Sequence, residues 1–185
     1  MAYNEKIQAD EELFRILRAI PVNENILLRL IVKSHMDMEA IGYLDISSMS
    51  IIQKYIPYAY VRTIEEAKDK VLEFRTRTEQ GGGLFYFISD LNTKIPLGCL
   101  NLASPLTETG LNSWTVDFWI HPRYQGRGIV TQSLTSALKY LKNYSVTEVR
   151  ALVNGENDKS INVLSNSGFS YEKESDDILV YKIEL

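Results

Sequence analysis

The chain has 185 residues, 45% of them hydrophobic and 24% charged, and its 20 Lys and Arg against 24 Asp and Glu give a net charge of −4. This length suits one domain, and the near-average composition excludes a disordered, collagen-like or coiled-coil chain. The acidic pI, near 5.3, argues against nucleic acid as a partner, because phosphate binding needs a basic face.

A single cysteine, Cys99, excludes an internal disulfide, and with only two histidines and no CxxC pair we expect no metal site. The first residues lack the basic and then apolar pattern of a signal peptide. The apolar runs are far shorter than the ~20 residues that span a bilayer. We therefore expect a cytoplasmic protein with no membrane partner.

The first predicted element is a helix over Asp10–Ile20, whose apolar residues have helical spacing and which Pro21 stops. Asn25–Val32 follows as a buried strand. Ser34 has the character of an N-cap for a second helix that runs to about Leu44.

The next predicted helix starts at Thr63, which has capping-box spacing to Glu66. Its apolar face contains Ile64, Ala67, Val71 and Phe74. The three glycines 81–83 favour a turn into a strand over a phosphate cradle, because neither a helix start nor a Lys-Ser/Thr pair follows them.

The rest of the chain alternates strands and helices. The expected strands are Leu84–Ser89, Ile95–Leu102, Ser113–Ile120, Thr147–Val153, Phe169–Lys173 and Ile178–Glu184, and the expected helices are Gly128–Lys142 and Asp158–Asn166. This order predicts an α+β or α/β fold, a sheet with helices on its faces.

The most informative segment is the loop Gln125-Gly126-Arg127-Gly128, which joins a strand to an amphipathic helix. A helix start with nearby glycines presents unpaired N–H groups and is a ready anion site. Residues 123–150 carry five basic side chains and one acidic, a net of +4 that leaves −8 for the remainder. The Gly-x-Gly pattern alone is equally compatible with a purely structural turn.

Three matches identify the chain as similar to a known family. Gln125–Val130 resembles the acetyl-CoA-binding motif of the GNAT superfamily of N-acetyltransferases, although Val130 stands where the family prefers Gly or Ala. Residues 157–160 with 168–172 resemble the family's downstream "Asn-x-x-Ser … Gly-Phe-x-x-Glu" pattern, and Asn25–Leu30 resembles the first strand of RimJ/RimL-type members. The resemblance covers residues 22–185, the expected N-acetyltransferase domain, and leaves 1–21 as an N-terminal helical extension.

The resemblance implies a GNAT fold, a central mixed but mostly antiparallel sheet that splays open, and acetyl-CoA as the cosubstrate with no metal. The pantetheine arm would lie along the main chain near Phe118 and Ile120, and the diphosphate on the amides of Gly126 to Thr131. The side chain of Trp119 would face either helices or substrate. The implied cofactor-binding residues are Phe118, Trp119, Ile120, Gln125, Gly126, Arg127, Gly128, Ile129, Val130, Thr131 and Asn157.

Two residues are candidates for catalysis. Thr115 occupies the position of the glutamate that many relatives have, so Asp117, two residues on and with the same side-chain parity, is the best carboxylate to act as base. Leu164 replaces the tyrosine that many relatives use, and Ser160 is the candidate partner for the thiolate. Each also has a structural reading: Asp117 as a solvent-facing residue, Ser160 as part of a helix start, and Asn157 as a helix cap.

The implied reaction is transfer of acetyl by direct attack of a primary amine, either a protein N-terminus or a small molecule. The alternative function is a non-catalytic acyl-CoA-binding or regulatory module of the same fold. The acceptor would be selected by the variable segments 44–62 and 103–112, where Tyr55, Tyr58 and Tyr60 are candidates to line its pocket. The sequence does not fix the oligomeric state, and a homodimer is left open.

Overall fold

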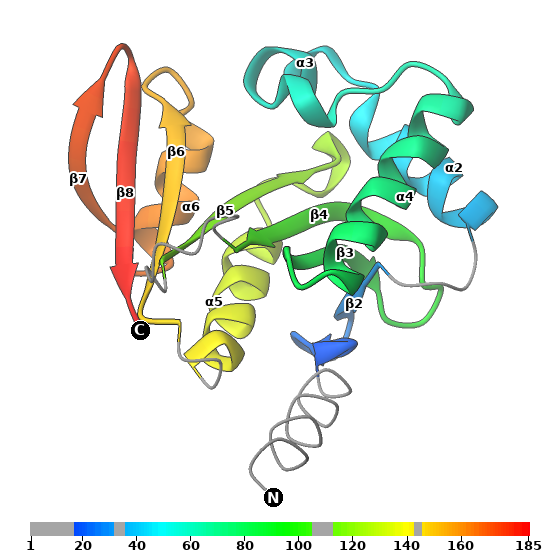
Figure 1. Cartoon of the computed structure of the whole chain (residues 1–185), viewed down its shortest axis with the longest axis horizontal. Coiled ribbons are helices and arrows are strands. Elements are labelled where there is room, and N and C mark those ends of the chain that lie inside the picture. The colour runs from blue at the N-terminus through cyan, green and yellow to red at the C-terminus, as the bar shows by residue number, and fades with distance from the viewer. Residues whose placement is uncertain (1–16, 32–35, 105–112, 143–145) are drawn as a thin grey trace, which may run out of the picture.

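The computed structural model describes residues 17–31, 36–104, 113–142 and 146–185. These residues form an eight-stranded sheet in the order β1-β2-β3-β4-β5-β6-β8-β7 (Figure 1). Neighbouring strands are antiparallel throughout, except that β5 and β6 are parallel. The predicted mixed, mostly antiparallel sheet flanked by helices is confirmed.

The described elements have the following bounds. The strands are β1 (Ala19–Pro21), β2 (Ile26–Leu30), β3 (Gly83–Asp90), β4 (Pro96–Ala103), β5 (Ser113–Ile120), β6 (Glu148–Asn154), β7 (Ser170–Ser175) and β8 (Ile178–Glu184). The helices are α2 (Met36–Ser47), α3 (Ser50–Tyr55), α4 (Ile64–Glu79), α5 (Ile129–Leu141) and α6 (Asp158–Asn166), with short 3-10 turns η1 (Pro57–Ala59) and η2 (Pro122–Tyr124).

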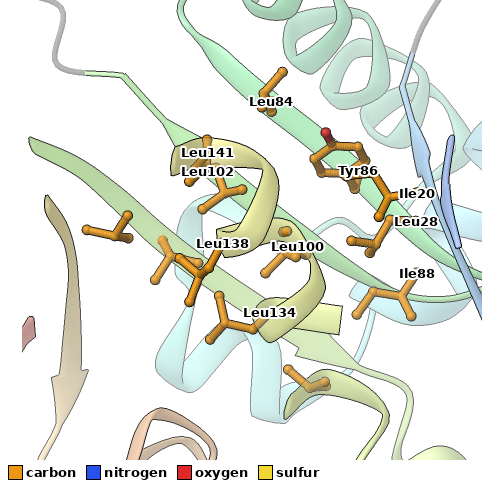
Figure 2. Packing of buried hydrophobic residues seen from close by; sticks show 14 of the residues in the cluster. Ile20, Leu28, Leu84, Tyr86, Ile88, Leu100, Leu102, Leu134, Leu138 and Leu141 are labelled. Carbon is orange, nitrogen blue, oxygen red and sulfur yellow. The ribbon is translucent and has the colours of Figure 1, made fainter. Parts of the chain in front are cut away.

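Helix α5 packs on one face of the sheet. Its residues Leu134, Leu138 and Leu141 lie against Leu100 and Leu102 of β4 in a continuous apolar cluster (Figure 2). Four of these five side chains are fully buried, and Leu138 is 6% exposed. This packing holds α5, and with it the loop at the start of α5, against the centre of the sheet.

Helices α2 and α4 cover the opposite face, over β3 and β4 (Figure 1). Phe74 of α4 stacks on Phe85 of β3 with ring centroids 5.0 Å apart, and Tyr43 of α2 meets the edge of Phe74 at 5.9 Å. Because both faces of the central strands are covered, β3 is buried along nearly its whole length rather than in alternation.

The predicted capping box at the start of α4 forms. Thr63 Oγ1 accepts a hydrogen bond of 3.2 Å from the Glu66 N–H, and the Glu66 carboxylate accepts one of 2.6 Å from the Arg62 N–H. The bond from the Arg62 N–H is the main influence that holds the pKa of the Glu66 carboxyl below its usual value. The bonds fix where the chain turns from η1 into α4.

The helix expected over Asp10–Ile20 is wrong at its C-terminal end, and residues 10–16 lie outside the described residues. Ala19–Pro21 is a strand that pairs with β2, with Ile20 opposite Leu28. The helical spacing of Leu17 and Ile20 is misleading. Both side chains are buried in the same core, each 1% exposed, but Leu17 is helical and Ile20 belongs to β1.

Other boundaries differ by a few residues. Strand β2 ends at Leu30, not at Val32, and the second helix extends to Ser47, beyond Leu44; Val32 and Ser34 lie outside the described residues. The remaining strands are shifted by no more than two residues at either end, among them β6 and β7. Strand ends are weakly encoded, because the side-chain pattern continues past the last ladder bond.

The segment 44–62, expected as a variable loop, contains the end of α2 and then α3 and η1. Buried Ile46, Ile52 and Ala59 anchor it to the helical face of the sheet. The N-cap of α3 is Met49, which makes no side-chain capping bond, so the sequence carries no start signal for this helix.

We predict that Phe74→Ala lowers the free energy of unfolding by about 3–5 kcal/mol, because it removes a fully buried ring from between two aromatic partners. Leu72→Ala on the same helix, where the side chain is 42% exposed, is the control and should cost less than about 1 kcal/mol. Urea unfolding followed by circular dichroism measures both. Equal losses would show that the core is not organised as described.

Candidate active site

The parallel pair β5–β6 is short and then opens. Its register runs only from Ser113 to Thr115 on β5, opposite Glu148 to Arg150 on β6. Beyond Thr115 the two strands diverge into a V (Figure 1). The predicted splay of the sheet is therefore present, at the predicted pair of strands.

The open edge of β5 presents main-chain groups to the splay. The N–H of His121 donates to the Leu97 carbonyl of β4 at 2.8 Å, which makes alternate residues of β5, including Trp119 and Asp117, the ones bonded to β4. The N–H and C=O groups of Phe118 and Ile120 point the other way, toward the gap. This edge is available to an extended ligand that pairs like a strand.

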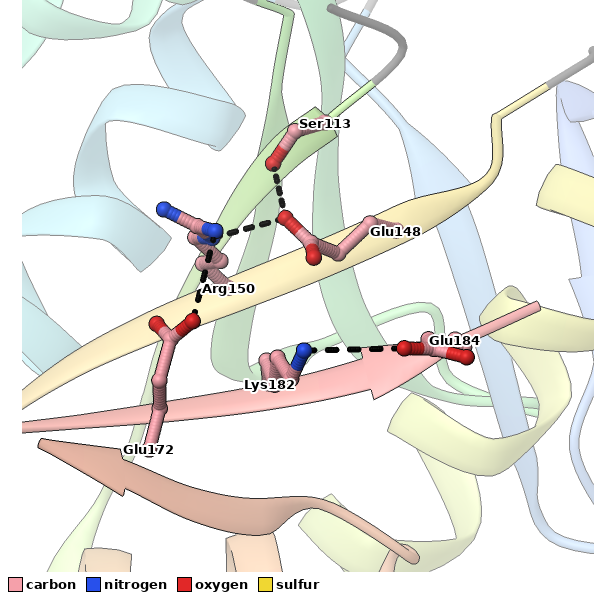
Figure 3. Close-up of polar contacts among 6 residues, drawn as sticks. All are labelled: Ser113, Glu148, Arg150, Glu172, Lys182 and Glu184. Atoms are coloured by element: carbon pink, nitrogen blue, oxygen red, sulfur yellow. Dashed lines mark hydrogen bonds and ion pairs between the residues drawn. The ribbon is translucent and has the colours of Figure 1, made fainter.

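A polar cluster holds the vertex of the V together (Figure 3). Ser113 Oγ of β5 donates to Glu148 Oε1 of β6 at 2.8 Å, and Arg150 Nε donates to the same oxygen at 2.7 Å. Arg150 also reaches Glu172 of β7 at 3.5 Å. The hydrogen bond from Ser113 lowers the pKa of the Glu148 carboxyl, so the cluster is charged at neutral pH.

The loop before α5 has the geometry of an anion site. Gly126 and Gly128 have positive φ angles of 74° and 69°, which a side chain would strain. Gly128 is the N-cap of α5 and offers no side chain to cap the helix, so the amides of Ile129, Val130 and Thr131 are left facing outward. A Cβ built on Gly126 meets no protein atom within 4 Å, so the space beside it is free for a ligand.

Basic side chains surround this loop. The guanidinium groups of Arg123 and Arg127 lie 6.0 and 5.7 Å from the ring centre of Tyr124. Lys159, at the start of α6, donates to Gln125 Oε1 at 2.8 Å and so joins α6 to the loop. These positive groups and the helix terminus together favour a diphosphate.

The start of α6 forms the second wall of the splay, opposite β5. Asn157 is the N-cap of α6, and its Oδ1 accepts from the Ser160 N–H at 3.3 Å. The capping role considered for Asn157 is therefore observed. The Ser160 hydroxyl takes no part in that bond, because the cap uses only the main chain of Ser160.

A cavity of about 270 Å³ lies in the splay. It brings together predicted residues from both walls, Asp117 and Phe118 from β5 and Asn157 and Ser160 from α6. Its remaining lining residues come from β5, β6, α6 and the α3–η1 segment: Thr115, Val116, Ala151, Leu152, Val153, Asn154, Leu164, Tyr55, Ile56 and Tyr58. Tyr60, the third tyrosine considered for the acceptor pocket, is not among them.

Burial raises the pKa of the Asp117 carboxyl from 3.8 to about 6. Hydrogen-bonding influence from Tyr58 and Asn101, and the positive charge of Arg77, act in the opposite direction and keep it from rising further. Asn101 Nδ2 donates to Asp117 Oδ1 at 2.9 Å. Asp117 is therefore not a simple solvent-facing residue, and a pKa near 6 suits a general base at neutral pH.

Trp119 does not offer its side chain to the splay. It is 4% exposed, belongs to the core under α2, and its Nε1 donates to Ser47 Oγ at 3.0 Å. Of the two orientations considered for the Trp119 side chain, the structure has the one toward the helices, because the alternation of β5 turns it to the same side as Asp117 and away from Phe118 and Ile120. A role of Trp119 in cofactor binding stays a prediction.

Sequence reasoning missed Asn101 and Arg77. Both lie outside any recognisable motif, and only the pairing of β4 with β5 and the packing of α4 bring them near Asp117. The single usable signal was Asn101 itself, a polar side chain within an apolar strand.

A second cavity, of about 900 Å³, lies beside the loop that precedes α5. It is lined by the start of β2 and the β3–β4 turn together with Tyr124, Arg127 and Ile129. It is larger than the cavity in the splay, but neither Asp117 nor Ser160 lines it. We therefore place the chemistry in the smaller cavity.

Neither a membrane helix nor a metal cluster is found among the described residues. No helix there is long and apolar enough to cross a membrane. No group of three or more His, Cys, Asp or Glu side chains is arranged there to hold a metal ion.

Comparisons with known proteins agree with this geometry. No curated protein matches the chain in sequence. Among solved structures, ribosomal-protein-S5-alanine acetyltransferase from Vibrio fischeri is 18% identical with a TM-score of 0.76, over 90% of this chain and 96% of that one. RimL, the ribosomal L7/L12 alpha-N-protein acetyltransferase, in complex with coenzyme A is 19% identical with a TM-score of 0.77, over 90% and 98%.

Microcin C7 self-immunity acetyltransferase, in complex with acetyl-CoA and AMP, is 17% identical with a TM-score of 0.75, over 91% of this chain and 97% of that one. At these identities the likeness establishes the fold. The family model for the acetyltransferase (GNAT) domain matches residues 25–170, more than three quarters of the chain. The chain therefore belongs to the GNAT acetyltransferase family, whose members use acetyl-CoA.

Proposed function

We propose that the chain acetylates a primary amine by direct attack of the amine on acetyl-CoA, with Asp117 as the base and Ser160 as the partner of the departing thiolate. The observation that carries this is the shared cavity: Asp117 and Ser160 line one space in the splay, beside the open main-chain edge at Phe118. Acyl transfer from a thioester to an amine requires a base that takes the amine proton, an N–H that polarises the thioester carbonyl and a hydrogen-bond donor for the departing thiolate.

The residues fit acetyl-CoA at two points. The amides from Gly126 to Thr131, at an uncapped helix start, suit the diphosphate. The main-chain groups of Phe118 and Ile120 suit the amides of the pantetheine arm. Acetyl-CoA supplies an activated thioester; the protein's part is to hold and orient it, to take a proton from the amine at the Asp117 carboxylate, and to donate one hydrogen bond from Ser160 Oγ.

The acceptor class is either a protein N-terminus or a small amine. The names of the ribosomal-protein acetyltransferases among the structural neighbours support a protein N-terminus. The α3–η1 segment and the open side of β6 are the walls that an acceptor would contact, since both line the cavity on the side of Asp117.

A non-catalytic acyl-CoA-binding module is the second candidate. It is favoured by Thr115 and Leu164, which stand where many relatives have a glutamate and a tyrosine. It predicts binding of acetyl-CoA with no turnover on any amine. Turnover of any amine distinguishes the enzyme from this module.

Gly126→Ala should weaken acetyl-CoA binding at least about tenfold, because the new Cβ occupies the space of the diphosphate. Gly81→Ala is a matched control: its φ is 75°, a Cβ there also meets nothing within 4 Å, and it lies in the α4–β3 turn, far from the loop. Calorimetric titration with acetyl-CoA measures both. Equal affinities in the two variants would place the diphosphate elsewhere.

Asp117→Asn should lower kcat/KM by about 10²–10⁴ through loss of the base. In the wild-type protein kcat/KM should rise with pH through about 6, because Asp117 is protonated and inactive as a base below that value. Release of the CoA thiol is followed over a panel of peptides with free N-termini, spermidine, glucosamine and lysine. Glu174→Gln, an exposed acid on β7, is the control. Full activity of Asp117→Asn would exclude Asp117 as the base.

Ser160→Ala should lower kcat about 10–100-fold, the range of one hydrogen bond to a charged group, with little change in the affinity for acetyl-CoA. The α6 cap survives this change, because Asn157 bonds the main-chain N–H of residue 160. Thermal unfolding at the wild-type midpoint would verify this. An unchanged kcat would leave Ser160 with a structural role only.

A further inference from the structure

Asn101 is an unexpected residue for its position. It lies on β4 directly opposite Asp117, on the sheet face that also carries Phe85, Cys99 and Trp119, and it is 1% exposed. Its Nδ2 donates to Asp117, but its Oδ1 is buried with no hydrogen-bond partner in the described part of the chain. A half-satisfied amide costs free energy that an apolar side chain of the same size would not, so packing does not explain it.

Tyr58 approaches the same carboxylate from a third element. It lies in η1, lines the cavity with Asp117, and is 46% exposed. Its hydroxyl faces Asp117 and Asn101 and influences the ionisation of the carboxyl through hydrogen bonding. Burial, and then the negative charge of Asp117, raise the pKa of Tyr58, so this hydroxyl stays protonated and able to donate.

The position of Tyr58 is fixed by two buried bonds. The hydroxyl of Tyr43, a fully buried side chain of α2, donates to the Ala59 carbonyl at 2.9 Å and holds η1. Trp119 holds α2 in turn, through its bond to Ser47. Strand β5, which carries Asp117, therefore also holds Tyr58 in place, because β5 bonds to α2 and α2 bonds to η1.

We propose that Asn101 and Tyr58 are positioning residues that orient the Asp117 carboxylate and keep it ionised for the acceptor amine. The proposal rests on the proposed function, in which Asp117 is the base. It gives a role to Asn101 and Tyr58, whose presence at these positions packing alone does not explain.

Other titratable groups also surround Asp117, and the test must separate them. Arg77 of α4, Tyr43 of α2 and Cys99 of β4 interact with Asp117 itself. Two further groups of α4 act on its neighbours: Lys70 lies over the Tyr58 ring, and Glu73 acts on Tyr43. Of these, Arg77 lowers the pKa of Asp117 through its positive charge. Burial raises the pKa of the Cys99 thiol, so this group is neutral and gives a neutral point of comparison.

The test is a carbon-13 NMR titration of the Asp117 carboxyl, identified by its absence in Asp117→Asn. The wild-type midpoint should lie near pH 6. Tyr58→Phe and Asn101→Leu should each raise it by about one pH unit, because each removes a donor to the charged form. Cys99→Ala, a buried change on the same strand and face, should lower stability but leave the midpoint in place.

Kinetics give the second readout. With the midpoint raised by one unit, kcat/KM at pH 6 should fall about fivefold from ionisation alone, while any loss that persists at pH 8.5 measures misorientation of the carboxylate. Affinity for acetyl-CoA, measured by calorimetry, should stay within about twofold of the wild-type value, since neither residue lies in the glycine loop before α5.

The base role of Asp117 and the positioning role of Asn101 and Tyr58 can be contradicted separately. Wild-type activity in Asp117→Asn overturns the base assignment itself. Unchanged midpoints in folded Tyr58→Phe and Asn101→Leu, alongside an inactive Asp117→Asn, overturn only the positioning role. If Asn101→Leu does not fold, Tyr58→Phe decides alone, because it removes a single hydroxyl from a residue that is 46% exposed and leaves the core intact.

Discussion

The structure depends on one constraint: β5 and β6 are parallel neighbours for only three residue pairs and then separate. A strand that loses its neighbour has unpaired main-chain groups, which normally invite pairing with another chain. Here the Ser113–Glu148–Arg150 cluster fixes the vertex, and the open edge of β5 faces β6 across the gap (Figure 1). The edge is thus available to a narrow, extended ligand.

The rest of the fold places chemistry along that edge. Helix α5 is held to the sheet by its apolar face, so its uncapped start lies at the mouth of the splay. On the other face, α2 is hydrogen-bonded to β5 through Trp119 and Ser47, and η1 is hydrogen-bonded to α2 through Tyr43. Arg123, Arg127 and Lys159 lie around the start of α5, and their positive charge favours capture of an anionic cosubstrate.

Most of the fold was predictable because its elements carry local signals. The capping box at Thr63, the periodicity of α5 and the Gly-x-Gly turn each express a contact within a few residues. The loop that we propose holds the diphosphate could be recognised for the same reason, since its motif is continuous. The α3 helix, with no capping side chain, and strand β1, hidden in a helical spacing, carry no such signal.

The acceptor side was only partly predictable: the sequence offers Asp117 and Tyr58 as separate candidates, but the contacts among them are assembled across the sheet. Asn101 and Asp117 are 16 residues apart and meet only through strand register, and Tyr58 reaches them through an unpredicted segment. The central claim, that the splay holds acetyl-CoA, is tested most directly by hydrogen–deuterium exchange with and without coenzyme A. We predict protection of the amides of Phe118, Ile120 and Gly126 to Thr131, and none in the α4–β3 turn. Exchange that is unchanged at those amides, with coenzyme A bound, would contradict it.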